Sequence, residues 1–136
     1  MHIADMHKHE RLECWKRAVA LSLEIAREIG SHRSTRHAGL LNQIDRSVAS
    51  IPANIAEGAG QSTNAQFARF LDVAIGSTQE SHSHLVLARG LRLFTPEQSS
   101  KWLDELVAIR RMLNGLSRHM RNEPRLEISP RAPAVD

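Results

Sequence analysis

The sequence contains few of the features that mark several common protein classes. Its single cysteine, Cys14, cannot form an internal disulfide, which fits a reducing compartment. No apolar run approaches the roughly 18 residues needed to span a bilayer, and the first ten residues lack the apolar core of a signal peptide. We therefore expect a cytoplasmic protein with no membrane partner.

Motifs of catalysis and cofactor binding are also missing. The sequence has no phosphate-binding Gly-rich loop, no Cys/His cluster, no H-E-x-x-H and no G-x-S-x-G. His82 and His84 are two residues apart, so on a helix they point in different directions and cannot share a metal ion. We expect both to face solvent. The sequence predicts no enzyme, no metal site and no cofactor; the alternative is a small hydrolase using Cys14 or the histidines.

Aromatic residues are scarce, with no tyrosine, three phenylalanines and two tryptophans. Base stacking on an aromatic platform is therefore not expected. Fifteen of the 18 basic residues are arginine and the pI is about 9.7. Arginine favours bidentate contact with phosphate, so any nucleic-acid binding would use phosphate contacts with weak sequence preference. The alternative is that these arginines only form a solvated surface.

The most informative stretch is residues 40–58, which carries two stripes at helical spacing. One stripe is apolar and consists of Leu40, Leu41, Ile44, Val48, Ile51 and Ile55. The other is polar and consists of Gln43, Arg46, Ser47, Ser50, Asn54 and Glu57. Pro52 lies inside the pattern, where it frees the carbonyl of Val48 and predicts a kink. Ser47 or Ser50 is expected to help satisfy that freed group.

The pattern predicts three further helices, at residues 9–29, 64–90 and 96–120. Thr63 with Gln66, and Thr95 with Gln98, form capping-box signatures at two of the helix starts. Short connections between such helices are typical of antiparallel neighbours. We therefore expect an all-α, up-and-down antiparallel four-helix bundle with a kinked second helix. A flexible lead-in at 1–8 would precede the domain at 9–121, and a disordered tail would follow at 122–136.

The polar stripe predicts a hydrogen-bonded network that fixes the register of the second and third helices. In this hypothesis Arg46 or Asn54 bonds Glu80 or the Ser77 hydroxyl, and Gly76 permits close approach of the helices. The predicted network comprises Gln43, Arg46, Ser50, Asn54, Glu57, Ser77 and Glu80. The alternative is an acid/base or metal site at Arg46, Glu57 and Glu80. The Glu-x-x-His pairs of a di-metal bundle are absent from this stripe.

The most basic stretch extends from Arg110 to Arg131 and contains six arginines and only two acidic residues. Arginines near the connection of the first two helices would add charge at one end of the bundle. The residues predicted to contact nucleic acid are Arg110, Arg111, Arg118, Arg121, Arg33 and Arg36.

Residues 12–93 also resemble a known family, the four helix bundle proteins. The resemblance is carried by Gln43, Arg46, the string SIPANIAEG at 50–58, Phe70, Leu71, Ala74, Gly76, Ser77 and Glu80. That family includes proteins encoded in intervening sequences of bacterial 23S rRNA genes, and the accessory variability determinants of diversity-generating retroelements. The resemblance implies a homopentameric ring and, for retroelement members, binding to nucleic acid and a reverse transcriptase.

Two functions follow as hypotheses. The first is a non-catalytic, oligomeric adaptor that binds RNA or DNA and could present it to a reverse transcriptase. The second is a protein-interaction module of the intervening-sequence group that binds no nucleic acid. Wide apolar faces on the first and fourth helices would supply a subunit interface in either case.

Overall fold

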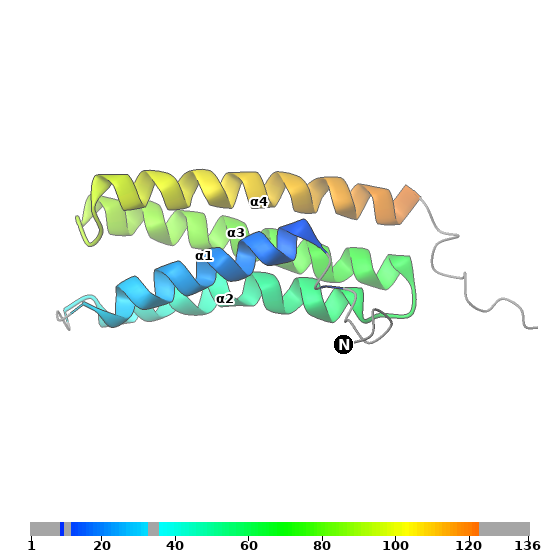
Figure 1. Ribbon diagram of the computed structural model, residues 1–136, viewed down its shortest axis with the longest axis horizontal. Helices are drawn as coiled ribbons and strands as arrows, with labels where there is room; N and C mark the ends of the chain where they lie inside the picture. Colours follow the sequence, from blue (N-terminus) through cyan, green and yellow to red (C-terminus); the bar gives the residue numbers. More distant parts are fainter. Residues whose placement is uncertain (1–8, 10–11, 33–35, 123–136) are drawn as a thin grey trace, which may run out of the picture.

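The computed structural model describes residues 9, 12–32 and 36–122. Four α-helices make up this part of the chain: α1 (Glu13–Gly30), α2 (Ala38–Ala59), α3 (Asn64–Gly90) and α4 (Pro96–Asn122). They lie side by side along one long axis and alternate in direction, and no strand occurs among the described residues (Figure 1). The predicted all-α up-and-down four-helix bundle is confirmed. The predicted lead-in at 1–8 and residues 123–136 of the predicted tail lie outside the described residues.

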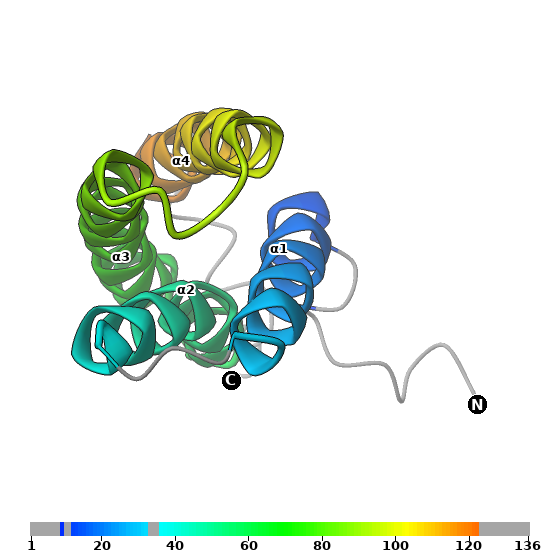
Figure 2. The ribbon, with the colours of Figure 1, turned by 90° about the vertical axis from the view of Figure 1, so that its left-hand side faces the viewer.

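The helices follow one another around the bundle axis in chain order (Figure 2). α3 packs closely against both α2 and α4. Of the neighbouring pairs around the bundle, α1 and α4 are in the least contact. Each helix contributes apolar side chains at the predicted spacing to a single core, because this spacing places them on one face. The largest fully buried side chains are Trp102, Ile25, Ile44, Ile51, Ile55, Leu71, Leu85, Leu106, Ile109 and Leu113.

The helix starts show how local sequence sets the boundaries. Thr63 accepts a hydrogen bond from the Gln66 backbone N–H at 3.1 Å. At the start of α4, Thr95 and Gln98 exchange side-chain and backbone hydrogen bonds at 2.9 and 3.0 Å, a complete capping box. Both predicted caps are confirmed. α1 begins at Glu13, later than the predicted residue 9, because the backbone of Leu12 is extended.

α2 continues through Pro52. The expected role of the neighbouring serines is wrong, because Ser47 donates to the carbonyl of Ile44 and Ser50 to that of Ser47. Neither hydroxyl reaches the carbonyl of Val48 that the proline frees. Burial of the adjacent apolar residues therefore offsets the cost of the proline, about 3 kcal/mol in a helix interior. The bend expected at Pro52 stays a prediction.

The close approach of α2 and α3 occurs at Gly58. The expectation from the sequence that it occurs at Gly76 is wrong. A Cβ on Gly58 would lie 2.8 Å from Phe67 Cδ1 and 2.8 Å from Phe70 Cβ. Gly76 is exposed, and a Cβ there would meet nothing within 4 Å. The loop after α2 folds the two phenylalanines of early α3 back onto Gly58, so this glycine is required for space.

Candidate functional site

The arginines predicted to bind nucleic acid do not form one surface. With 27 residues, α4 is about 40 Å long. Arg118 and Arg121 lie near its carboxyl end, whereas exposed Arg36 lies just before α2, at the opposite end of the bundle. Arg33 lies outside the described residues. The antiparallel arrangement therefore separates residues that the sequence analysis had grouped together.

Arg121 is held by its own protein. Its Nη2 lies 2.6 Å from Asp72 Oδ2, and its Nη1 contacts both Asp72 Oδ1 at 3.2 Å and Ser117 Oγ at 2.5 Å. The guanidinium lowers the pKa of the Asp72 carboxyl, and the carboxylate raises the pKa of Arg121. This side chain links α3 to α4, and phosphate would have to compete with a bidentate carboxylate for it.

Three predicted arginines have no side-chain partner within the part of the chain that the structure describes: Arg110, Arg111 and Arg118. Arg111 and Arg118 are exposed. They are seven residues apart, so they share one face of α4 about 10 Å apart along its axis. Arg110 is half-buried in a groove of about 340 Å³ between α3 and α4, which His82 also lines. These three guanidinium groups make up the arginine face of α4.

Two arginines at the turn between α3 and α4 were missed. Arg89 and Arg92 are exposed and line a groove of about 700 Å³ together with Thr95 and Ser100. The sequence held a signal for them, because two arginines three residues apart flank the glycine that ends α3. Their convergence on a single groove depends on the turn, which helical periodicity does not describe.

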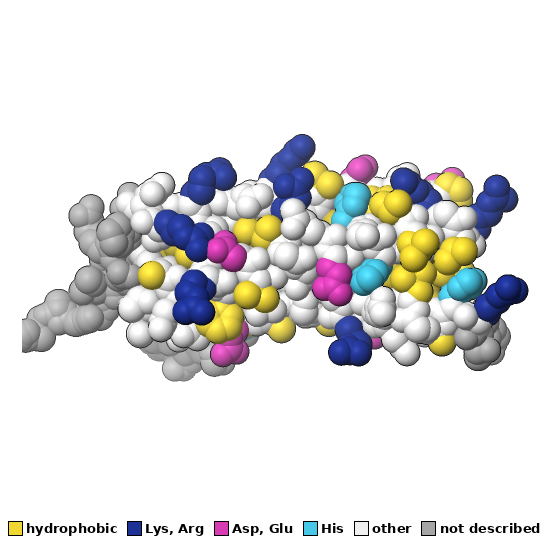
Figure 3. Space-filling model, turned by 180° about the vertical axis from the view of Figure 1, so that it is seen from behind, with side chains coloured by type: hydrophobic (Ala, Val, Ile, Leu, Met, Phe, Trp, Pro, Cys, Tyr) yellow, Lys and Arg dark blue, Asp and Glu magenta, His cyan; other side chains and the backbone are white. Residues whose placement is uncertain are grey.

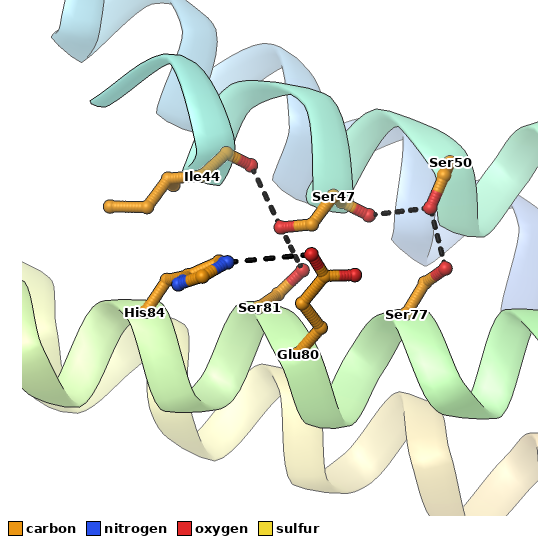
Figure 4. Close-up of polar contacts among 7 residues, drawn as sticks. All are labelled: Ile44, Ser47, Ser50, Ser77, Glu80, Ser81 and His84. Carbon is orange, nitrogen blue, oxygen red and sulfur yellow. Dashed lines mark hydrogen bonds and ion pairs between the residues drawn. The ribbon is translucent and has the colours of Figure 1, made fainter. Parts of the chain in front are cut away.

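The polar stripe of α2 faces α3 through two pairs of serines (Figure 4). Ser47 Oγ lies 2.8 Å from Ser81 Oγ, and Ser50 Oγ lies 2.6 Å from Ser77 Oγ. Ser47, Ser77 and Ser81 are buried, so each pair satisfies hydroxyls that would otherwise be desolvated. We call these four residues the serine seam; it includes Ser47 and Ser81, which the predicted network omitted.

The other members of the predicted network lie around this seam. The Asn54 side-chain amide donates to the Ser50 carbonyl at 2.8 Å, and Glu80 Oε2 lies 3.4 Å from His84 Nε2. Arg46 and Glu57 are exposed, with no side-chain partner among the described residues. The expected contacts of Arg46 or Asn54 with Glu80 or Ser77 are therefore absent from this part of the chain. Exposed Gln43 lines the same groove as Arg46, Glu80 and His84.

The candidate reactive groups among the described residues are histidines and Cys14. The expectation that His82 and His84 face solvent is wrong, because both are half-buried. The ring of His84 is directed to Glu80 (Figure 4). The pKa of the Cys14 thiol is raised by burial, which favours the unreactive thiol over the thiolate. Within residues 9, 12–32 and 36–122 no three His, Cys, Asp or Glu side chains are placed to hold a metal ion. In the same residues, no helix is long and apolar enough to cross a membrane.

Comparison with known families decides the relationship. The model of the 23S rRNA-intervening sequence protein family matches residues 10–115. The chain belongs to this family. The similarity predicted from the SIPANIAEG string is thereby confirmed. No curated protein matches the chain.

A solved relative shows the same fold. It is a protein with unknown function from the S23 ribosomal protein family of Bacteroides thetaiotaomicron, and its crystal structure superposes with a TM-score of 0.70. The match covers 77% of this chain and 98% of the relative at 21% sequence identity. At that identity the likeness concerns the fold alone.

Some of the candidate arginines lie inside the residues matched by the family model and others lie beyond them. Arg89, Arg92, Arg110 and Arg111 lie inside residues 10–115. Arg118 lies beyond the matched residues, as does Arg121 with its carboxylate pair. The family match therefore covers only part of the arginine face of α4.

Proposed function

We propose that this family member is a non-catalytic, oligomeric adaptor that binds RNA or DNA through phosphate contacts. The observation that carries the proposal is the arginine face of α4. Arg110, Arg111 and Arg118 have no carboxylate partner in the described part of the chain. By contrast, Arg17 is paired with Glu105, and Arg121, also on α4, is paired with Asp72.

Unpaired arginines on one helix can bind phosphate groups, because a guanidinium donates two parallel hydrogen bonds to the oxygens of a phosphate. Arg111 and Arg118 extend along the axis of α4, so they could follow a nucleic-acid backbone. None of the described phenylalanine and tryptophan side chains is exposed, so base stacking on them is not expected. Binding is therefore expected to be salt-dependent and weakly selective for sequence.

Self-association would multiply these contacts. A ring of subunits, a homopentamer by family resemblance, raises the effective concentration of each arginine face and could present a nucleic acid to a reverse transcriptase. The sequence analysis expected spare apolar surface on α1 and α4. In the structure the exposed apolar side chains lie mostly on α3 and just after it. The exposed large hydrophobic residues in the described part of the chain are Leu23, Val73, Val86, Leu87 and Leu91.

Fluorescence anisotropy with a labelled structured RNA and a labelled DNA duplex tests the proposal. The variant Arg111→Gln/Arg118→Gln removes two charges from the arginine face. We expect it to weaken binding by about tenfold or more at low salt, and to flatten the dependence of affinity on salt because fewer counterions are released.

The matched control is Arg27→Gln/Arg69→Gln, which removes the same net charge from exposed positions on α1 and α3. It should weaken binding much less than the α4 variant. Equal losses in the two variants would show that only total charge matters. No binding of the wild-type protein to either nucleic acid at low salt would overturn the proposal.

A second candidate function, a protein-interaction module without nucleic-acid binding, is favoured by the exposed apolar side chains. Leu87 is 55% exposed and Leu91 is 42% exposed. Hydrophobic side chains gather near one end of the face shown in Figure 3, among histidines and basic residues. A partner retained on the wild-type protein after nuclease treatment of a lysate, but lost in Leu87→Ser/Leu91→Ser, would support this function.

A further inference from the structure

The turn between α3 and α4 places Arg92 in an unusual backbone conformation. Arg92 has a φ of 57°, the left-handed region that favours glycine. The Leu93 N–H donates to the Ala88 carbonyl and the Arg92 N–H to the Arg89 carbonyl, both at 3.0 Å. These two bonds form a Schellman motif, in which glycine is the usual residue at the position of Arg92. The chain therefore carries an arginine where glycine would be the more stable choice.

This turn forms one wall of the groove of about 700 Å³ described above. Arg89 and Arg92 both line it, and neither has a side-chain partner among the residues that the structure describes. No acidic residue lines the groove. Two positive charges with no carboxylate beside them create a site for an anion.

Hydroxyl groups add neutral donors to the same groove. Thr95 Oγ1 accepts from the Gln98 backbone N–H at 3.0 Å, which leaves the hydroxyl proton available to a ligand. Ser100 is exposed one turn further along α4. The Ser99 N–H donates to the Thr95 carbonyl at 2.9 Å. The start of α4 is therefore already capped, and the groove depends on side-chain donors.

The floor of the groove is apolar and firmly held. Phe94 is buried, with its ring 4.9 Å from that of Trp102 and 5.2 Å from that of His32 at the end of α1. Leu93 and Pro96 complete the apolar lining. These contacts join Phe94 to α4 and to His32, just after α1, so the apolar floor of the groove is positioned before any ligand arrives.

We propose that this groove binds a terminal phosphate group, carried by a nucleic-acid end or by a free nucleotide. A phosphate monoester carries a charge of roughly −1.5 to −2 near neutral pH, which two guanidinium groups can balance. A backbone phosphodiester carries only one charge. The apolar floor would lie beneath the sugar or base next to that phosphate. The site is separate from the arginine face of α4.

The test compares two single-stranded DNA oligonucleotides of one sequence, labelled at the 3′ end, with either a 5′-phosphate or a 5′-hydroxyl. The wild-type protein should bind the phosphorylated oligonucleotide about tenfold more tightly. Arg92→Gly and Arg89→Gln should each remove that preference. Arg92→Gly suits the left-handed backbone, so it should fold at least as stably as the wild type and separate binding from stability.

Charge-matched and site-matched variants sharpen the result. Arg27→Gln, in the last turn of α1, should leave the preference for the 5′-phosphate unchanged. Arg111→Gln should weaken binding of both oligonucleotides by the same factor, because it acts on the arginine face of α4. A preference for the 5′-phosphate that survives in Arg92→Gly would overturn the proposal. Equal affinity of the wild type for the two oligonucleotides would overturn it together with the absence of an AMP effect in the next experiment.

Thermal unfolding with AMP and with adenosine identifies the source of the phosphate and does not depend on nucleic-acid binding. AMP should raise the Tm of the wild type but not of Arg92→Gly, and adenosine should raise neither. In a competition experiment, AMP and the unlabelled phosphorylated oligonucleotide each displace the labelled phosphorylated oligonucleotide from the wild type. Equal displacement by AMP would identify a nucleotide site, and weaker displacement a nucleic-acid end. If neither oligonucleotide binds but AMP still raises the Tm, the proposed function fails and the phosphate site stands. No effect of AMP and no 5′-phosphate preference would overturn the site.

Discussion

The seam between α2 and α3 and the seams that α4 makes with its neighbours are held by different chemistry. Between α2 and α3 the polar contacts are neutral, from Ser47 to Ser81 and from Ser50 to Ser77. α4 is joined to its neighbours by ionised groups. Arg17 of α1 meets Glu105 of α4 at 2.6 Å, Glu24 of α1 accepts from Lys101 and Trp102, and Asp72 of α3 binds Arg121.

The difference lies in burial. Three of the four seam serines are buried, where an ion would lose its hydration, and a hydroxyl can be satisfied by one partner. The ionised pairs of α4 lie at the rim, with Asp72 and Arg121 side chains about half exposed. Such pairs contribute little individually and depend on salt and pH. The comparison therefore predicts that the α2–α3 seam tolerates changes of solution conditions and that the α4 seams do not.

The largest expected effect comes from closing the space at Gly58. Gly58→Ala places a Cβ 2.8 Å from Phe70 Cβ and 3.1 Å from the Phe67 carbonyl oxygen, so α2 and α3 must move apart. We expect a loss of roughly 3 kcal/mol in the free energy of unfolding, measured by urea denaturation. In the control Gly76→Ala the new methyl meets nothing, and the better helix former should add about 1 kcal/mol. Equal stability of the two variants would contradict the close packing at Gly58.

A smaller effect is expected from the serine seam. Ser81→Ala removes the hydrogen bond to Ser47 while creating almost no cavity, so it should lower the free energy of unfolding by about 1 kcal/mol. Because the bond is buried and neutral, the loss should be the same at low and high salt. The control Arg46→Ala changes an exposed member of the same stripe and should stay within about 0.5 kcal/mol. If Ser81→Ala leaves the free energy of unfolding unchanged, the serine seam does not stabilise the bundle.

The smallest effect is a pH dependence confined to the seams of α4. Hydrogen bonds from Trp102 and then Lys101 lower the pKa of Glu24 below its ordinary 4.5, and Arg121 lowers that of Asp72 below its ordinary 3.8. Since both pKa values are depressed in the folded state, their stabilisation is present above the ordinary values and is lost as the pH falls through the depressed ones. The urea midpoint should therefore decrease in this acidic range.

The variants Glu24→Gln and Asp72→Asn should reduce that acid dependence, since neither side chain can then titrate. Glu97→Gln removes an exposed carboxylate that has no partner among the described residues, and it should leave the dependence unchanged. If all three variants show the wild-type decrease in urea midpoint, the ionised contacts of α4 are not its source.

The fold could be predicted from the sequence because its signals are local. The spacing of apolar residues, the Thr63 and Thr95 caps and the glycine at 90 each act within one or two turns of a helix, so they fix helix position without knowledge of the neighbours. The exceptions were the starts of α1 and α2, where no side chain caps the helix. Without a cap, the boundary depends on the surrounding packing.

The site could be predicted only in part because it depends on pairs that are distant in sequence. Arg121 and Arg118 are equivalent in the sequence, yet Asp72, 49 residues from Arg121, engages only one of them. Arg89 and Arg92 converge on one groove because the backbone of Arg92 turns to the left-handed region. Helical periodicity contains no information on either feature.

The sequence by itself determined four helices, the caps of α3 and α4 and the residues that face the core, since each follows from a repeat of 3.6 residues and from neighbouring side chains. Only the tertiary structure decided which glycine separates α2 from α3, which hydroxyls pair across them, and which arginines are engaged by carboxylates. Those outcomes depend on contacts between residues brought together by the antiparallel packing of the helices. Their energies arise from burial and geometry across the bundle, which no local pattern records.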